Sequence, residues 1–176
     1  MASVLICCCI IERYERIDYL QIDESPRNII NALSIFALMR LTLPHLIIEY
    51  SENLENTIDM AGLVDAMHAT AVTLDPLPTG GIRTRSVARR DFRIADGHRD
   101  NGFISVVLRI AKGRSDDEKQ AVGEALFSTL TGYVERAFDM GPMSLALEIQ
   151  EIDPETRWKQ SNIREYMEKR RGTGSG

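Results

Sequence analysis

The sequence predicts an α+β fold in which two β-α-β units form a four-stranded sheet with two helices on one face. Two observations support this prediction. Short apolar, β-branched runs alternate along the chain with two long stretches in which apolar residues recur at helical spacing. The order is strand, helix, strand, and then the same three elements again, which is typical of two β-α-β units side by side. The other face of such a sheet needs a different cover.

The first unit begins with Leu46-Ile47-Ile48, an apolar run suited to a buried strand. Between Met60 and Leu74, apolar residues recur three and four positions apart, which predicts a helix with one buried face. Two prolines and a Gly-Gly pair within residues 76–81 then end this helix and turn the chain.

Strand patterns return after this turn. Residues 82–87 predict the second strand of the first unit, and residues 92–95 predict a further strand or hairpin segment. Asp96-Gly97 closes that segment as a turn dipeptide. Residues 103–110 are mostly β-branched or aromatic and predict the strand that opens the second unit.

The second helix has clear start and stop signals. Ser115 and Glu118 have the spacing of a capping box, which satisfies two free N–H groups at a helix start. A long apolar stripe follows over residues 122–138, and Gly141-Pro142 stops the helix. Residues 144–152 alternate between apolar and polar side chains and predict the last strand.

Composition limits the function classes. The 176 residues carry a net charge of −5 and lack a basic stretch suited to a phosphate backbone, so we expect no nucleic-acid partner. The apolar run at residues 4–11 is too short to span a bilayer, and no Lys or Arg precedes it. We therefore expect neither a membrane partner nor secretion. The chain has no cysteine after residue 43, which fits a reducing cytoplasm.

The chain divides at Pro44. All three cysteines lie at residues 7–9, a spacing that suits neither a disulfide framework nor a zinc site. We expect residues 1–43 to be an N-terminal extension, either disordered or not part of the native protein. Residues 44–165 form the predicted domain, and residues 166–176 form a polar tail.

Four residues are candidates for a functional site. Arg83 and Arg85 follow a Gly-Gly turn and share one face of a strand, where a guanidinium matches a carboxylate. Arg114 precedes the capping box, beside free N–H groups that favour anions. By residue type alone, each arginine is equally suited to a solvated surface, and Pro44 to the start of an edge strand. We expect neither Arg83 nor Arg114 in the core.

From Pro44 onward, the sequence resembles the 5-carboxymethyl-2-hydroxymuconate isomerase family of the tautomerase superfamily. The resemblance rests on four patches in register: Pro44-His45 with Ile48-Glu49, Gly81-Ile82-Arg83-Thr84-Arg85, Gly113-Arg114-Ser115, and Trp158-Lys159-Gln160-Ser161-Asn162. It implies a tautomerase-like homotrimer that uses a free N-terminal proline as its base. It also implies that Arg83 is the active-site arginine, Arg114 a second carboxylate ligand and Arg85 a weaker candidate for substrate binding.

The resemblance implies an isomerase without a cofactor or metal. Its substrate would be a small carboxylated dienol from homoprotocatechuate breakdown. Neutral Pro44 would take the proton of the 2-hydroxyl group, and a proton would return at carbon five. Two alternatives remain open: a non-catalytic trimer that binds carboxylates, and a tautomerase for a different dicarboxylate.

One departure from the family decides whether Pro44 is active. A proline inside a chain is a tertiary amide without a basic lone pair, and 43 residues precede Pro44 here. Leu43 stands where the family has its initiator methionine. A TTG codon is written as leucine when it is read as internal, but it is decoded as methionine when translation starts there. We expect translation to begin at position 43. Met39 is the competing start, but it would leave four residues to be removed by a protease.

The three histidines give no metal site, because they are far apart and lack ligand spacing. His45 suits either the pocket or packing, whereas His68 lies beside the apolar stripe of the first helix and fits a structural role. His98 lies in a polar turn. The patch that begins at Trp158, which includes Lys159, fits an arm that packs across a trimer interface.

Overall fold

The computed structural model describes residues 44–172, and our expectations for residues 1–43 and 173–176 lie outside this part. Its elements in chain order are β1 (His45–Ser51), η1 (Glu52–Asn56), α3 (Met60–Thr73), η2 (Thr79–Gly81), β2 (Arg83–Arg89), β3 (Gly102–Ala111), α4 (Asp116–Met140), β4 (Met143–Ile152), η3 (Pro154–Thr156) and α5 (Ile163–Gly172). None of the helices in the described range is long and apolar enough to cross a membrane.

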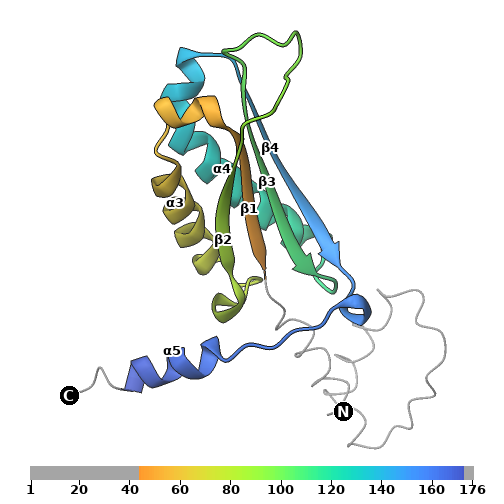
Figure 1. The fold of residues 1–176 in the computed structure, drawn as a ribbon. Coiled ribbons are helices and arrows are strands. Elements are labelled where there is room, and N and C mark those ends of the chain that lie inside the picture. Colours follow the sequence, from red (N-terminus) through yellow and green to blue (C-terminus); the bar gives the residue numbers. More distant parts are fainter. Residues whose placement is uncertain (1–43, 173–176) are drawn as a thin grey trace, which may run out of the picture. The chain divides into compact units, whose positions relative to one another are not determined.

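The sheet has the order β2-β1-β3-β4 (Figure 1). β1 pairs with β2 in parallel, β3 pairs with β4 in parallel, and the two central strands β1 and β3 are antiparallel. The predicted β1-α3-β2 and β3-α4-β4 units are therefore confirmed. α3 and α4 pack against each other and against the sheet, so they cover the same face.

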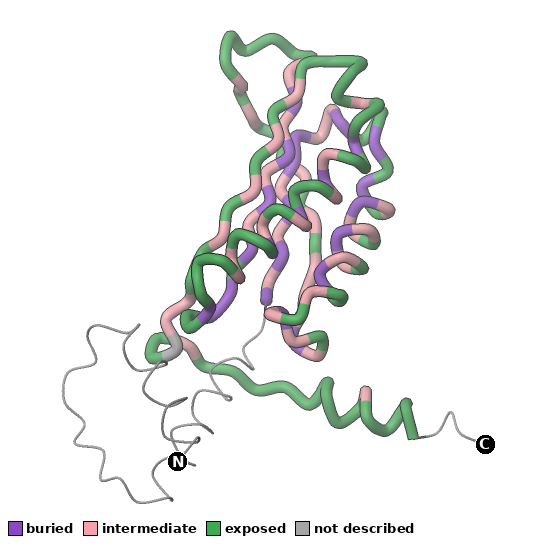
Figure 2. The backbone as a smooth tube through the Cα atoms, turned by 180° about the vertical axis from the view of Figure 1, so that it is seen from behind, coloured by how far each residue is buried: buried purple, intermediate pink, exposed green. Residues whose placement is uncertain are grey.

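The core lies between the sheet and these two helices (Figure 2). Alternate residues of β1 and β3 point into it, because side chains in a strand alternate between the two faces. α4 contributes one residue per turn from Val122 to Val134. The fully buried side chains are Leu46, Ile48, Leu63, Met67, Ile104, Val106, Leu108, Ile110, Val122, Leu126, Leu130 and Val134.

Both main helices start at side-chain caps. The Asp59 side chain accepts a hydrogen bond from Gly62 N, 3.0 Å away, at the start of α3. At α4 the predicted capping box is confirmed: Ser115 Oγ accepts from Glu118 N at 3.2 Å, and Glu118 Oε2 accepts from Ser115 N at 2.8 Å. α4 ends at Met140, directly before the Gly141-Pro142 pair that predicted its end.

The prediction of a strand at residues 92–95 is wrong, because this segment belongs to the loop between β2 and β3. Its apolar signal has another use: the Phe92 ring packs edge-on against Phe103, with 6.4 Å between ring centroids. The Asp96-Gly97 turn is present, with Gly97 N donating to Ile94 O at 2.8 Å and Gly97 at a φ of 79°.

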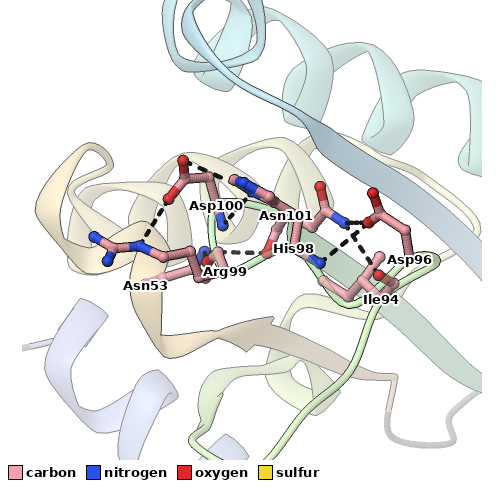
Figure 3. A network of polar contacts seen from close by, with 7 residues as sticks. All are labelled: Asn53, Ile94, Asp96, His98, Arg99, Asp100 and Asn101. Atoms are coloured by element: carbon pink, nitrogen blue, oxygen red, sulfur yellow. Dashed lines mark hydrogen bonds and ion pairs between the residues drawn. The ribbon is translucent and has the colours of Figure 1, made fainter.

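Asparagine side chains replace strand pairing in this loop (Figure 3). Asn101 Nδ2 donates to Ile94 O at 3.0 Å and to Asp96 Oδ1 at 2.8 Å. Asn53, from η1, donates to the carbonyls of Arg99 and Asn101. The loop's backbone carbonyls therefore find donors without a neighbouring strand.

The helix α5 was not expected, and it runs across the boundary that we placed at residue 165. None of its residues is buried, and charged residues make up most of its length. The Arg164 side chain lies against Gly80 of η2, at the turn that leads into β2. The start of α5 is thus brought next to the turn before β2.

Candidate active site

The predicted site residues lie at one end of the sheet. His45, at the start of β1, is the register partner of Arg83 at the start of β2 and of Arg109 near the end of β3. Pro44 directly precedes β1, and Arg114 follows the end of β3 by three residues. The end of β4 lies there as well, since Arg109 pairs in register with Gln150 (Figure 1).

Pro44 and Arg83 are joined directly through the backbone. Arg83 N donates to Pro44 O at 2.9 Å, so pairing with β2 begins one residue before β1 itself. The half-buried Arg83 side chain donates from Nη1 to Gly81 O at 3.2 Å. These contacts make Arg83 the strand neighbour of Pro44, the residue that the resemblance identifies as the base, and tie the Arg83 guanidinium to the turn before β2.

His45 and Arg85 occupy the sheet face opposite the helices. The neighbouring residue Thr84 bonds to His68 of α3, so Arg83 and Arg85 point the other way. Arg85 Nη1 lies 3.3 Å from His45 Nδ1. Because a guanidinium only donates, His45 Nδ1 is the acceptor and the ring proton lies on Nε2.

The electrostatics of His45 agree with this assignment. Burial lowers the pKa of His45 below its ordinary value of 6.5, and the positive charges of Arg85 and Arg83 lower it further. His45 is therefore neutral at pH 7, with an Nε2 proton to donate. The sequence left its role open between the pocket and packing, and strand alternation could not reveal the contact with Arg85.

Arg114 is buried, which overturns the expectation that it lies outside the core. The residue is 5% exposed. Nε donates to Pro76 O at 2.8 Å, and Nη1 donates to Ala111 O at 3.0 Å. Arg114 therefore ties the segment after α3 to the end of β3. A structural role at the edge of the site accounts for these two contacts.

The segment after β4 adds two cations: Arg157, which sequence reasoning missed, and Lys159, which it placed only in an arm across a trimer interface. Burial lowers the pKa of Arg157, and the positive charge of Arg83 lowers it further. Burial also lowers the pKa of Lys159, with Arg157, Arg164 and Arg83 contributing in that order. Within residues 44–172, no carboxylate contributes to either shift in pKa. The part of the site formed by these residues is strongly positive and suited to anions.

The remaining histidines take no part in this arrangement. His68 Nδ1 lies 2.9 Å from Thr84 Oγ1, which confirms its structural role. His98 belongs to the loop between β2 and β3, where its Nδ1 accepts from Asp100 N at 3.3 Å (Figure 3). Within residues 44–172, no cluster of His, Cys, Asp or Glu side chains has the composition of a metal site.

Comparison with known proteins agrees with this geometry. Residues 44–167 match the model of a family described as 5-carboxymethyl-2-hydroxymuconate isomerase. Over 121 residues, the chain is 31% identical to the 5-carboxymethyl-2-hydroxymuconate Delta-isomerase of Escherichia coli, an alignment that covers 69% of this chain and 96% of that protein.

Two solved structures show the same fold. A 5-carboxymethyl-2-hydroxymuconate isomerase from Deinococcus radiodurans R1 is 30% identical with a TM-score of 0.67, covering 72% of this chain and 95% of its own. A 5-carboxymethyl-2-hydroxymuconate delta-isomerase is 24% identical with a TM-score of 0.69, covering 74% and 96%. The chain therefore belongs to the 5-carboxymethyl-2-hydroxymuconate isomerase family and has the fold of that family of isomerases.

Proposed function

We propose that this protein isomerises a carboxylated 2-hydroxymuconate of the 5-carboxymethyl type, with the free amine of Pro44 as the base. The observation that supports the proposal is the hydrogen bond from Arg83 N to Pro44 O, which makes Arg83 the strand neighbour of Pro44. The family match begins at residue 44 itself. The curated Escherichia coli relative is named for the same reaction.

The chemistry follows from a terminal amine among cations. An α-amino group has an ordinary pKa of about 7.7–8.0, and neighbouring positive charge lowers it. Neutral Pro44 nitrogen takes the proton of the 2-hydroxyl group, so the O–H bond breaks and carbon two becomes a carbonyl. The double bonds shift by one position, and the proton then forms a new C–H bond at carbon five. Arg83 stabilises the dienolate between these steps.

This mechanism requires that Pro44 be the first residue of the working protein. Translation from codon 43, followed by removal of the initiator methionine, would release its amine. N-terminal sequencing and the intact mass of protein from its own cells test this requirement. A native chain that retains residues 1–43 would contradict the proposed mechanism and favour a protein that binds carboxylates without turning them over.

A kinetic comparison tests the role of the amine itself. Protein that begins at Pro44 should consume the dienol, which is followed by the loss of its ultraviolet absorbance. Protein with one extra alanine before Pro44 should fold alike and lose nearly all activity, because its proline nitrogen is an amide. Equal rates would rule out Pro44 as the base. Assay with other dicarboxylated dienols then defines the substrate within this class.

We also propose a homotrimer assembled through the open face of the sheet. That face carries apolar side chains at Ile47, Val87, Phe103 and Val107, which the helices in the described range do not cover. An apolar sheet face needs a partner layer. Light scattering after gel filtration should give three times the chain mass, and a monomeric mass would contradict this assembly. Cytoplasmic homoprotocatechuate breakdown is the setting that we propose.

A further inference from the structure

We propose that Arg157, in the segment after β4, is a further substrate-binding residue that grips one carboxylate of the substrate together with Arg83. This inference rests on the proposed function, because it names the recognition group for a multiply carboxylated substrate. Neither residue type nor spacing pointed to Arg157 in the sequence. The structure supplies three observations that do.

The first observation is that the Arg157 guanidinium is buried without hydrogen bonds at its tip. Nη1 and Nη2 are both inaccessible to solvent, and neither has a hydrogen-bond partner within residues 44–172. A buried donor without a partner is costly, and more so when it carries charge. Such an arrangement is expected where a ligand completes the site.

The second observation is the charge around Arg157. Its neighbour Arg83 is a cation, and the nearby Lys159 side chain adds a third positive charge. Like charges brought together favour an anion between them. A carboxylate has two oxygens that match the planar fork of a guanidinium, so one carboxylate can accept from both arginines.

Other arginines of this protein show that the arrangement at Arg157 is unusual. Arg89 bonds to Glu49 at 2.9 Å, and Arg90 bonds to Glu52 at 2.8 Å. These arginines lie on exposed surface and have a carboxylate from the protein itself. Arg157 is more buried than either and has no carboxylate partner within residues 44–172, which leaves its guanidinium available to a carboxylate of a ligand.

The third observation is that the chain holds Arg157 in place. Asp153 Oδ2 accepts from Lys112 Nζ at 3.0 Å, which ties the end of β4 to the end of β3. Asp153 Oδ1 also accepts from Glu155 N at 2.9 Å and caps the short turn η3. This anchored turn returns the chain to the end of the sheet where Arg83 lies.

The test separates binding from turnover. The binding probe is 2-(carboxymethyl)hexanedioate, which has three carboxylates but no reacting diene. Calorimetric titration would use protein with its native N-terminus, as the wild type and as Arg157→Met, Arg157→Lys and Arg136→Ala. Methionine keeps the apolar stem of the side chain, and lysine keeps the charge without the fork. Arg136 is an exposed arginine on α4 and controls for the loss of one charge.

We expect Arg157→Met to raise the dissociation constant about 10- to 100-fold, the scale for a charge-assisted hydrogen bond. Arg157→Lys should lie between this variant and the wild type, and Arg136→Ala should bind like the wild type. Without the probe, the Arg157→Met variant should melt no lower than the wild type, because it loses only an unsatisfied buried charge. With the dienol substrate, Arg157→Met should raise KM by the same factor and leave kcat nearly unchanged.

Binding by Arg157→Met within twofold of the wild type would overturn the inference, and so would an equal loss in Arg136→Ala. A wild-type protein that does not bind the probe would also overturn it. Failure of the proposed function has a different signature, in which the wild type binds the probe but does not turn over the dienol. The dissociation constants of the Arg157 variants would still decide the inference in that case.

Discussion

At the scale of single residues, Arg83 and Arg114 have opposite environments although the same resemblance singled out both. Arg83 is half-buried and uses one side-chain donor on the carbonyl of Gly81. Arg114 is almost fully buried and donates to two carbonyls from separate segments. Removal of the Arg83 side chain should therefore be detected mainly by kinetics, and removal of the Arg114 side chain mainly by unfolding.

For Arg83→Ala, we expect kcat/KM to fall by about 2–4 kcal/mol, the scale for one donor that stabilises developing charge. The free energy of unfolding should change less than in Arg114→Ala, because the Arg83 side chain donates one hydrogen bond, to Gly81 O, and Arg114 donates two. Steady-state kinetics and urea unfolding measure the two quantities. Arg89→Ala, on the same face of β2 but bonded to Glu49, is the matched control and should keep its activity. Wild-type activity in Arg83→Ala would remove Arg83 from the site.

For Arg114→Ala, we expect a loss of stability of about 2–4 kcal/mol, because the carbonyls of Pro76 and Ala111 lose their donor. Urea unfolding measures the change in free energy. Arg114→Lys should recover part of the loss by supplying one donor. A variant with wild-type stability and reduced substrate affinity would show that Arg114 acts on the ligand alone.

For His45, the lowered pKa predicts a pH dependence of stability. Above about pH 6.5, the ordinary value, His45 is neutral in both the folded and the unfolded chain. Below it, the unfolded chain binds a proton that the folded protein does not, so the free energy of unfolding falls until the lowered pKa is reached. His45→Gln should lack this part of the decline. Parallel pH profiles of the two proteins would contradict the assignment.

The site could be predicted from the sequence only in part, for physical reasons. Pro44, Arg83 and Arg114 lie in patches with a local signature, and the paired β-α-β units bring those patches to one end of the sheet. Arg157 lies in no strand or helix, and its position depends on the Asp153–Lys112 contact between residues 41 positions apart. The burial of Arg114 depends on packing that periodicity does not encode.

At the scale of elements, local chemistry decided which predictions held. The capping box set the start of α4 because its two hydrogen bonds join residues three apart. Part of the loop between β2 and β3 was mistaken for a strand because of its apolar residue Phe92. This side chain packs on Phe103 and does not belong to a hydrogen-bonded strand. α5 was missed because none of its residues is buried and its apolar residues Ile163, Tyr166 and Met167 cover little more than one turn, which is too short for a periodic pattern.

For Ser115→Ala, we expect α4 to lose its N-terminal cap. The free energy of unfolding should fall by about 0.5–2 kcal/mol. The side chain accepts from Glu118 N, and this donor would be left to solvent. Chemical unfolding provides the measurement. Ser144→Ala is a control on the exposed side of β4 and should change stability by a few tenths of a kcal/mol at most. An equal effect of the two substitutions would rule out the cap as the cause.

At the scale of the whole molecule, the core of the described part of the chain lies within residues 44–152. Every member of the buried cluster lies within this range, from Leu46 in β1 to Val134 in α4. We expect residues 44–172 to fold alone and the thermal midpoint to stay unchanged or rise when residues 1–43 are removed. Calorimetry of the two proteins measures this. A broad, non-cooperative transition in the shorter protein would contradict the division at Pro44.

The hydrogen bond from Arg83 N to Pro44 O has a consequence for motion. Chain ends usually fray, because few contacts hold them. Here the residue at the head of β1 enters a central strand that has a neighbour on each side, β2 and β3. The carbonyl of Pro44 is held by β2 and the next residue is paired on both sides, so an amine on Pro44 would fray less than an ordinary chain end. Fraying that misaligns the amine would have to break the first pairing of β1 with β2.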